Sequence, residues 1–214
     1  MADVIKLTFN PFQENMYLVY DQSGECIIFD PGCFEAHEKQ TLIDTIERLQ
    51  LRPVRLINTH CHLDHVFGNK FVADTYGLTL ECHRGEVPVL EAVEQVCSMY
   101  GIPYPEKSPA PGKFIEPGST IEFGQTSLKV LFTPGHSPAS ICFYQEQDQF
   151  IIAGDVLFRD SIGRTDLPGG DHETLLESIR TQLYTLPDKV TVYPGHGPKT
   201  TIAYEKQNNP FVRE

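Results

Sequence analysis

The sequence lacks the features that mark membrane, exported and low-complexity proteins. No apolar run approaches the roughly 20 residues that a membrane-spanning helix needs. The N-terminal segment Met1–Val4 shows neither the basic region nor the apolar core of a secretion signal, and no segment is of low complexity. We therefore expect a cytoplasmic protein without a membrane partner.

Positive charge is also scarce. The chain has 17 Lys and Arg against 29 Asp and Glu, which gives a formal net charge of −12 at pH 7. Such a chain repels phosphate backbones, so nucleic acid is not an expected partner. With 214 residues, 40% hydrophobic and 21% charged, the composition is that of a globular protein with a sizeable core. We predict one domain spanning residues 1–214.

The cysteines form no C-x-x-C pair that would indicate a redox or zinc motif. Since no secretion signal is present, we expect reduced thiols, most of them in the core. The six positions are Cys26, Cys33, Cys61, Cys82, Cys97 and Cys142.

Strand and helix patterns alternate along the chain. The runs Asn15–Tyr20 and Cys26–Phe29 are typical of paired strands, and apolar residues recur at helical spacing over Glu35–Leu51. Further strand-like runs lie between residues 120 and 153, and Asp171 is placed as the N-cap of a later helix. This order predicts a mixed α/β architecture in which helices cover sheets.

A dense group of metal-ligating residues follows one predicted strand in the segment T-H-C-H-L-D-H. Its candidate ligands are His60, His62, Asp64 and His65. In extended backbone His60 and His62 lie on one side of the chain. One ion cannot readily take four ligands from six consecutive residues, which favours two adjacent ions about 3.5–4 Å apart. The alternative is a polar loop with chance histidines, which a chain with only eight histidines makes improbable.

Three more candidate ligands follow later strands. His136 and His196 stand in matching P-G-H-x-P segments, and Asp155 follows the apolar run Ile151–Gly154. Taken singly they are typical of turn histidines and a capping aspartate. Beside the histidine cluster, their shared position at strand ends favours metal binding, and the two oxygens of Asp155 can bridge two ions.

The ligand types indicate the metal and the chemistry. Imidazole and carboxylate without thiolate suit Zn²⁺, Fe or Mn. A structural zinc site would be richer in cysteine, and Cys61 is expected to point away from its neighbours into the core. Two such ions make a water nucleophilic at neutral pH and polarise a carbonyl, so the sequence predicts metal-assisted hydrolysis.

These motifs resemble those of the metallo-β-lactamase superfamily. The resemblance rests on T-H-x-H-x-D-H over residues 59–65, followed in order by the three later ligands. It implies an αββα sandwich of two mixed β-sheets flanked by helices. It also implies that His60, His62 and His136 bind the first ion, that Asp64, His65 and His196 bind the second, and that Asp155 bridges them.

Within that superfamily the chain is most similar to the compact bacterial branch of the glyoxalase II group, the hydroxyacylglutathione hydrolases. The segments Gly154–Phe158 and Gly163–Leu167 carry this similarity. It implies hydrolysis of a small thioester, S-D-lactoylglutathione, by a metal-bridging hydroxide at a site for one or two Zn²⁺ ions, with Fe or Mn as alternatives. Asp64 and Asp155 are the implied catalytic residues.

The same resemblance assigns a substrate-binding role. Arg164 aligns with a basic residue that binds the glutathione moiety in the group, where a cation can hold a carboxylate. The chain departs from the group at Asp166 and Pro198, where typical members have tyrosine. We therefore predict thioester hydrolysis with a possible glutathione conjugate as substrate, and leave the thiol open.

Two other functions remain open. A persulfide dioxygenase with a single Fe(II) shares the ligand set and a similar Gly-Arg-Thr-Asp segment, and two histidines and one aspartate leave positions on iron for O₂. A non-catalytic metal-binding module would be expected to lack a ligand, and none is missing here.

Overall fold

The computed structural model describes residues 1–104 and 106–213, which divide into two compact units. Unit 1 comprises Met1–Ile115 and Glu122–Thr126, and unit 2 comprises Glu116–Ile121 and Ser127–Glu214. A single domain over residues 1–214 stays a prediction. Within the described residues, no helix combines the length and the apolar character needed to cross a bilayer.

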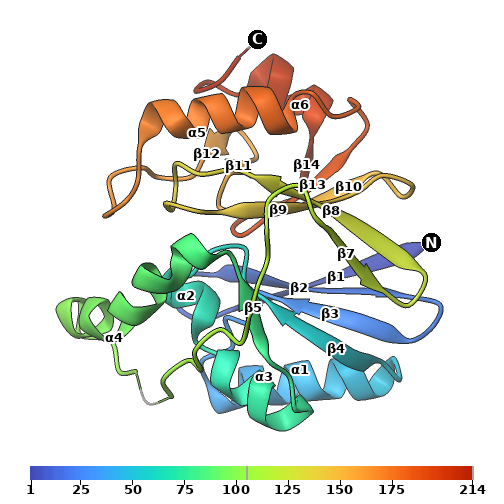
Figure 1. Cartoon of the computed structure of the whole chain (residues 1–214), viewed down its shortest axis with the longest axis vertical. Helices are drawn as coiled ribbons and strands as arrows, with labels where there is room; N and C mark the ends of the chain where they lie inside the picture. Colours follow the sequence, from blue (N-terminus) through green and yellow to red (C-terminus); the bar gives the residue numbers. More distant parts are fainter. Residues whose placement is uncertain (105, 214) are drawn as a thin grey trace. The chain divides into compact units, whose positions relative to one another are not determined.

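Unit 1 contains a mixed six-stranded sheet (Figure 1). Its first three strands are antiparallel neighbours, whereas the last three follow β3 in parallel, as expected where helices connect the strands. In spatial order the strands are β1 (Ala2–Phe9), β2 (Glu14–Asp21), β3 (Glu25–Phe29), β4 (Arg52–Ile57), β5 (Leu80–Cys82) and β6 (Lys113–Phe114).

Two helices of unit 1 end at a glycine. Gly77 and Gly101 adopt left-handed φ values of 65° and 68°, which other residues adopt at a cost, so they close α3 and α4. The helices are α1 (Ala36–Arg48), α2 (Leu63–Val66), α3 (Asn69–Tyr76) and α4 (Val87–Tyr100), with a 3₁₀ turn over Arg84–Glu86.

The core of unit 1 lies between the sheet and its helices. Leu42 and Ile46 of α1 and Val72 of α3 are buried against Ile28 and Leu56 of the central strands. Helices α1 and α3 thus cover one face of the sheet (Figure 1). This burial of apolar surface fixes the strand ends from which the site residues extend.

A second mixed six-stranded sheet is formed mostly by residues of unit 2. From one edge to the other its order is β14 (Thr200–Thr201), β13 (Thr191–Pro194), β10 (Phe150–Gly154), β9 (Ile141–Gln145), β8 (Thr126–Phe132) and β7 (Thr120–Phe123). A small hairpin pairs β11 (Leu157–Phe158) with β12 (Ser161–Ile162).

Two helices accompany this sheet. Helix α5 (His172–Ser178) continues into a π-helical turn over Ile179–Leu183, and α6 (Ile202–Asn208) follows β14. Leu175 and Ile179 pack with residues of β10 and β13 in one buried cluster. The predicted N-cap is confirmed, because the Asp171 side chain accepts a hydrogen bond from the Thr174 amide at 2.8 Å.

Asp21 joins two turns of unit 1 and gives a test of this packing. Its carboxylate accepts hydrogen bonds from Ser23, Gln125 and Thr126. Burial works to raise the pKa of this carboxyl, but these hydrogen bonds outweigh burial and hold the pKa below its ordinary value. The stabilisation is therefore present above the unfolded-state pKa of about 3.9 and is lost as the pH falls through the lower folded-state pKa.

We expect Asp21→Asn to lower the free energy of unfolding by about 1 kcal/mol at pH 7, since a neutral amide replaces a charged acceptor of several hydrogen bonds. The difference from wild type should shrink as the pH falls below about 4, where the wild-type carboxylate is itself protonated. Urea denaturation at pH 7 and pH 3 measures both effects. The exposed Asp3→Asn serves as control, and a difference that stays constant with pH would contradict the assignment.

Candidate metal centre

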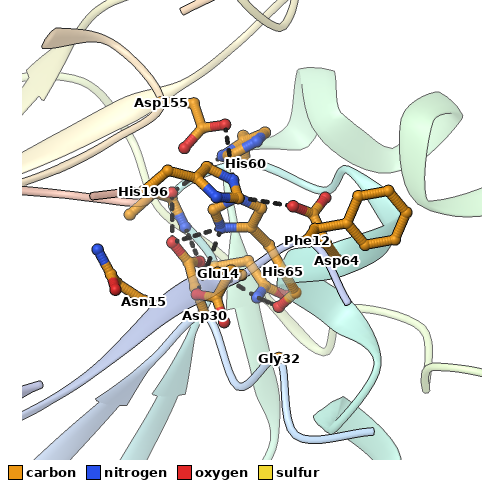
Figure 2. Close-up of polar contacts among 12 residues, drawn as sticks. Phe12, Glu14, Asn15, Asp30, Gly32, His60, Asp64, His65, Asp155 and His196 are labelled. Atoms are coloured by element: carbon orange, nitrogen blue, oxygen red, sulfur yellow. Dashed lines mark hydrogen bonds and ion pairs between the residues drawn. The ribbon is translucent and has the colours of Figure 1, made fainter. Parts of the chain in front are cut away.

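The histidine cluster of unit 1 begins where β4 ends. The chain leaves β4 at Ile57, stays extended at His62, and turns into α2 at Leu63. The rings of His60 and His62 meet edge to face with centroids 4.8 Å apart. The rings of His60 and His65 have centroids 4.1 Å apart (Figure 2). The segment after β4 therefore carries two imidazoles, and the first turn of α2 places Asp64 and His65 next to them.

Three of these four side chains are almost fully removed from solvent, and His62 is half-buried. His60 and His65 are 0% exposed and Asp64 is 9% exposed. The Nε2 atom of His65 lies 3.8 Å from Oδ2 of Asp64. Buried imidazole and carboxylate groups so close together need hydrogen-bond partners or a cation.

Asp30 contacts both the chain segment that carries the cluster and one of its histidines. It directly follows β3, and its carboxylate accepts hydrogen bonds from the amide of Thr59 at 2.7 Å and from the hydroxyl of Thr59 at 2.6 Å. Its Oδ2 lies 3.2 Å from Nδ1 of His65 (Figure 2). Asp30, His60 and His65 offer ligand atoms within 4.8 Å of one another. A carboxylate at Nδ1 orients the ring and makes Nε2 the atom available to a metal.

Two residues near the cluster had no signal in the sequence. Glu14, buried in β2, brings Oε1 to 3.8 Å from the same His65 nitrogen. Asn10 donates from its amide to the carbonyls of Gly32 at 2.9 Å and Asp64 at 3.0 Å. Both come from the β1–β2 hairpin, far from the motif in the sequence, so only the sheet pairing brings them here.

Cys61 is buried as predicted. It is 0% exposed, and its amide donates to the buried carboxylate of Glu86 at 2.9 Å. A hydrogen bond with Cys82, together with burial, raises the pKa of the Cys61 thiol well above its ordinary value. Because the thiolate is the metal-binding form, this disfavours Cys61 as a ligand.

The candidate ligands of unit 2 also follow strand ends. His136 follows β8, Asp155 follows β10 and His196 follows β13. Strands β10 and β13 are parallel, and β8 and β10 share one direction because each is antiparallel to β9. All three residues therefore leave the sheet at the same edge.

Asp155 lies between the two histidines of this group. Its Oδ2 is 3.5 Å from Nε2 of His136 and 3.4 Å from Nε2 of His196. Two ligand atoms about 2.0–2.2 Å from one tetrahedral ion are about 3.3–3.6 Å apart. The donor atoms of unit 2 thus have the spacing that a shared cation requires, and their chemistry fits Zn²⁺, Fe or Mn.

The orientation of His136 is set by its other ring nitrogen. Nδ1 donates to the carbonyl of Arg164 at 2.7 Å, which leaves Nε2 for Asp155 and a metal. Gly163 makes this approach possible. A Cβ at that position would lie 1.9 Å from the carbonyl oxygen of Asp155 and 3.0 Å from the His136 ring.

The side chain of Arg164 forms an ion pair within its own loop. Nε and a terminal nitrogen donate to the two carboxylate oxygens of Asp166 at 2.6 and 2.7 Å. The hydrogen bonds from Arg164 lower the pKa of Asp166 to about 2. The carboxylate is therefore ionised at all physiological pH values.

The predicted site residues thus fall into two groups. Unit 1 brings together His60, His62, Asp64 and His65, and unit 2 brings together His136, Asp155 and His196. Arg164 lies beside the second group. That these residues bind metal and substrate stays a prediction.

Comparison with known proteins gives the family. The model of the metallo-β-lactamase superfamily matches residues 9–196. The chain belongs to this superfamily, whose members bind divalent metals. The predicted family and the predicted pair of mixed sheets with flanking helices are confirmed.

Individual relatives cover nearly the whole chain. A "probable metallo-hydrolase YqgX" of Bacillus subtilis is 37% identical over 97% of this chain and 96% of its own. The "hydroxyacylglutathione hydrolase GloC" of Haemophilus influenzae is 35% identical over 94% of this chain and 93% of its own.

Solved structures agree with this. The BLEG-1 B3 metallo-β-lactamase matches with a TM-score of 0.90 and 35% identity, over 99% of this chain and all of that one. TTHA1623, in a di-iron-bound form, matches with a TM-score of 0.86 and 36% identity, over 97% of this chain and 100% of its own. ETHE1 from Myxococcus xanthus matches with a TM-score of 0.79 and 26% identity, over 98% of this chain and 84% of its own.

The contact of Asp30 with His65 gives a prediction for metal affinity. Asp30→Asn keeps the shape of the side chain but removes the negative charge beside the ring, so the affinity for Zn²⁺ should fall about 10–100-fold. Competition with a chromogenic chelator measures it. The exposed Asp44→Asn, on α1, is the control, and equal affinities for all three proteins would contradict the role of Asp30.

Proposed function

We propose that this protein is a metal-dependent hydrolase of a small thioester, with S-D-lactoylglutathione as the first substrate to test. In this proposal the ligand candidates of both units act together on one or two Zn²⁺ ions. The residues that would hold the ions are His60, His62, Asp64, His65, His136, Asp155 and His196.

The observation that carries the proposal is the position of Asp155. One carboxylate oxygen faces Nε2 of His136 and Nε2 of His196 at 3.5 and 3.4 Å, which is the spacing of ligand atoms that share a cation. A carboxylate has two oxygens and can bridge two ions, so Asp155 is the proposed bridging ligand.

When bound, the ions would lower the pKa of a water and polarise the thioester carbonyl. The protein contributes orientation. Asp30 and the Arg164 carbonyl hold the Nδ1 atoms of His65 and His136 so that both Nε2 atoms are available. Asp64 would also accept a hydrogen bond from the attacking water and orient it toward the carbonyl carbon.

The relatives support the choice of metal and substrate. The Haemophilus influenzae relative is named a hydroxyacylglutathione hydrolase, which supports a glutathione thioester. The di-iron-bound form of TTHA1623 supports Fe as an alternative to Zn²⁺. Arg164 is the proposed substrate-binding residue, because its own carbonyl contacts His136.

A second candidate function is the Fe(II) persulfide dioxygenase. The similarity to ETHE1 from Myxococcus xanthus favours it. One assay separates the two functions. Metal-analysed protein is given S-D-lactoylglutathione, with loss of thioester absorbance as readout, and glutathione persulfide, with O₂ consumption as readout. Turnover of the thioester alone supports the proposal, and O₂ consumption alone supports the dioxygenase.

Removing Asp155 should remove both metal and activity. We expect Asp155→Ala to lose at least half of the bound metal and to lower kcat at least about 10³-fold, since a bridging ligand is lost. Metal content per chain and thioester turnover are the two measurements. Asp188→Ala, an exposed aspartate paired with Lys206, is the matched control. Full activity of the Asp155 variant would refute the proposed centre.

A further inference from the structure

The loop after β12 presents two charged side chains next to a candidate metal ligand. The amide of Gly163 donates to the Val156 carbonyl at 3.4 Å, and the amide of Asp171 donates to the Gly135 carbonyl at 2.8 Å, so both ends of the loop are tied down. Between them, the carbonyl of Arg164 accepts from His136. The His136 ring therefore contacts the backbone of the same residue that carries the guanidinium.

An incoming carboxylate must compete with Asp166 for the guanidinium of Arg164. The edge formed by Nε and a terminal nitrogen is one of the two edges that can bind a carboxylate in bidentate fashion, and Asp166 occupies it. Both side chains remain exposed, at 59% for Arg164 and 68% for Asp166. The pair is thus accessible to substrate, but its charges cancel.

We propose that Asp166 is a specificity-determining residue that discriminates against substrates with a carboxylate for Arg164. This inference rests on the proposed function and names its substrate class. The preferred thioesters carry a thiol half that is uncharged where it meets this loop. A glutathione thioester binds less tightly, because its carboxylate competes with Asp166 for the guanidinium.

The physical argument is one of competition. Asp166 is tethered two residues from Arg164, so it competes at a high local concentration with any carboxylate in solution. A carboxylate of the substrate can still bind the remaining N–H donors of the guanidinium, but there it is repelled by the negative charge of the adjacent Asp166. The net charge of −12 adds a long-range repulsion of anionic substrates. Exposed ion pairs are weak, so the expected discrimination is about 2–5-fold.

The test compares two thioesters with the same acyl group. S-D-lactoylglutathione carries two carboxylates and one ammonium group, whereas S-D-lactoyl-N-acetylcysteamine is uncharged. The quantity measured is the ratio of kcat/KM for the first over the second. Asp166→Asn is compared with wild type and with Asp74→Asn, which removes the same charge from the exposed Lys70–Asp74 pair of 2.6 Å on α3.

We expect Asp166→Asn to raise this ratio about 2–5-fold through a lower KM for the glutathione thioester. Adding Arg164→Gln to that variant should abolish the gain, and 0.5 M NaCl should reduce it. Asp74→Asn should leave the ratio at the wild-type value. An unchanged ratio in Asp166→Asn, or an equal loss of kcat on both thioesters, would overturn the inference.

A binding measurement separates this inference from the proposed function. S-methylglutathione is a thioether and cannot be hydrolysed, so calorimetry with it needs no turnover. Tighter binding to Asp166→Asn than to wild type supports the inference even if neither thioester is hydrolysed, in which case only the proposed function fails. Equal binding to both proteins, together with hydrolysis of both thioesters at an unchanged ratio, rejects the inference and leaves the function standing.

Discussion

The direction of the strands is the constraint on which the candidate site depends. In unit 2, β8, β10 and β13 run the same way, so the residues that follow them leave the sheet at one edge. In unit 1, β3 and β4 are parallel, which brings Asp30 and the histidine cluster to neighbouring strand ends. Apolar cores hold these strands, and the polar residues that follow them have little freedom to move apart.

The two groups of ligands hold their histidines by different means. Nδ1 of His65 lies against the carboxylate of Asp30, whereas Nδ1 of His136 donates to the backbone carbonyl of Arg164. A carboxylate partner makes an imidazole a stronger electron donor than a carbonyl partner does. If both groups bind ions as proposed, the two ions meet ligands of unequal basicity. The arrangement thus favours unequal affinities at the two positions.

Local patterns predicted much of this structure, and contacts between distant segments account for the rest. The cap at Asp171 and the helix ends at Gly77 and Gly101 follow from turn chemistry, and all were recognisable in the sequence. The two-residue strands β6, β11, β12 and β14 are too short to have a period. Helix α6 was missed because its apolar face is small. Glu14 and Asn10 could not be assigned, because hairpin pairing alone brings them to the cluster.

All six cysteines are buried, and this has a practical consequence. Burial raises the pKa of Cys26 and of Cys33 to about 12, and alkylating reagents attack the thiolate rather than the thiol. The native protein should therefore react very slowly with maleimides. A single cysteine introduced on the surface can carry a fluorophore or spin label without any native thiol first being replaced.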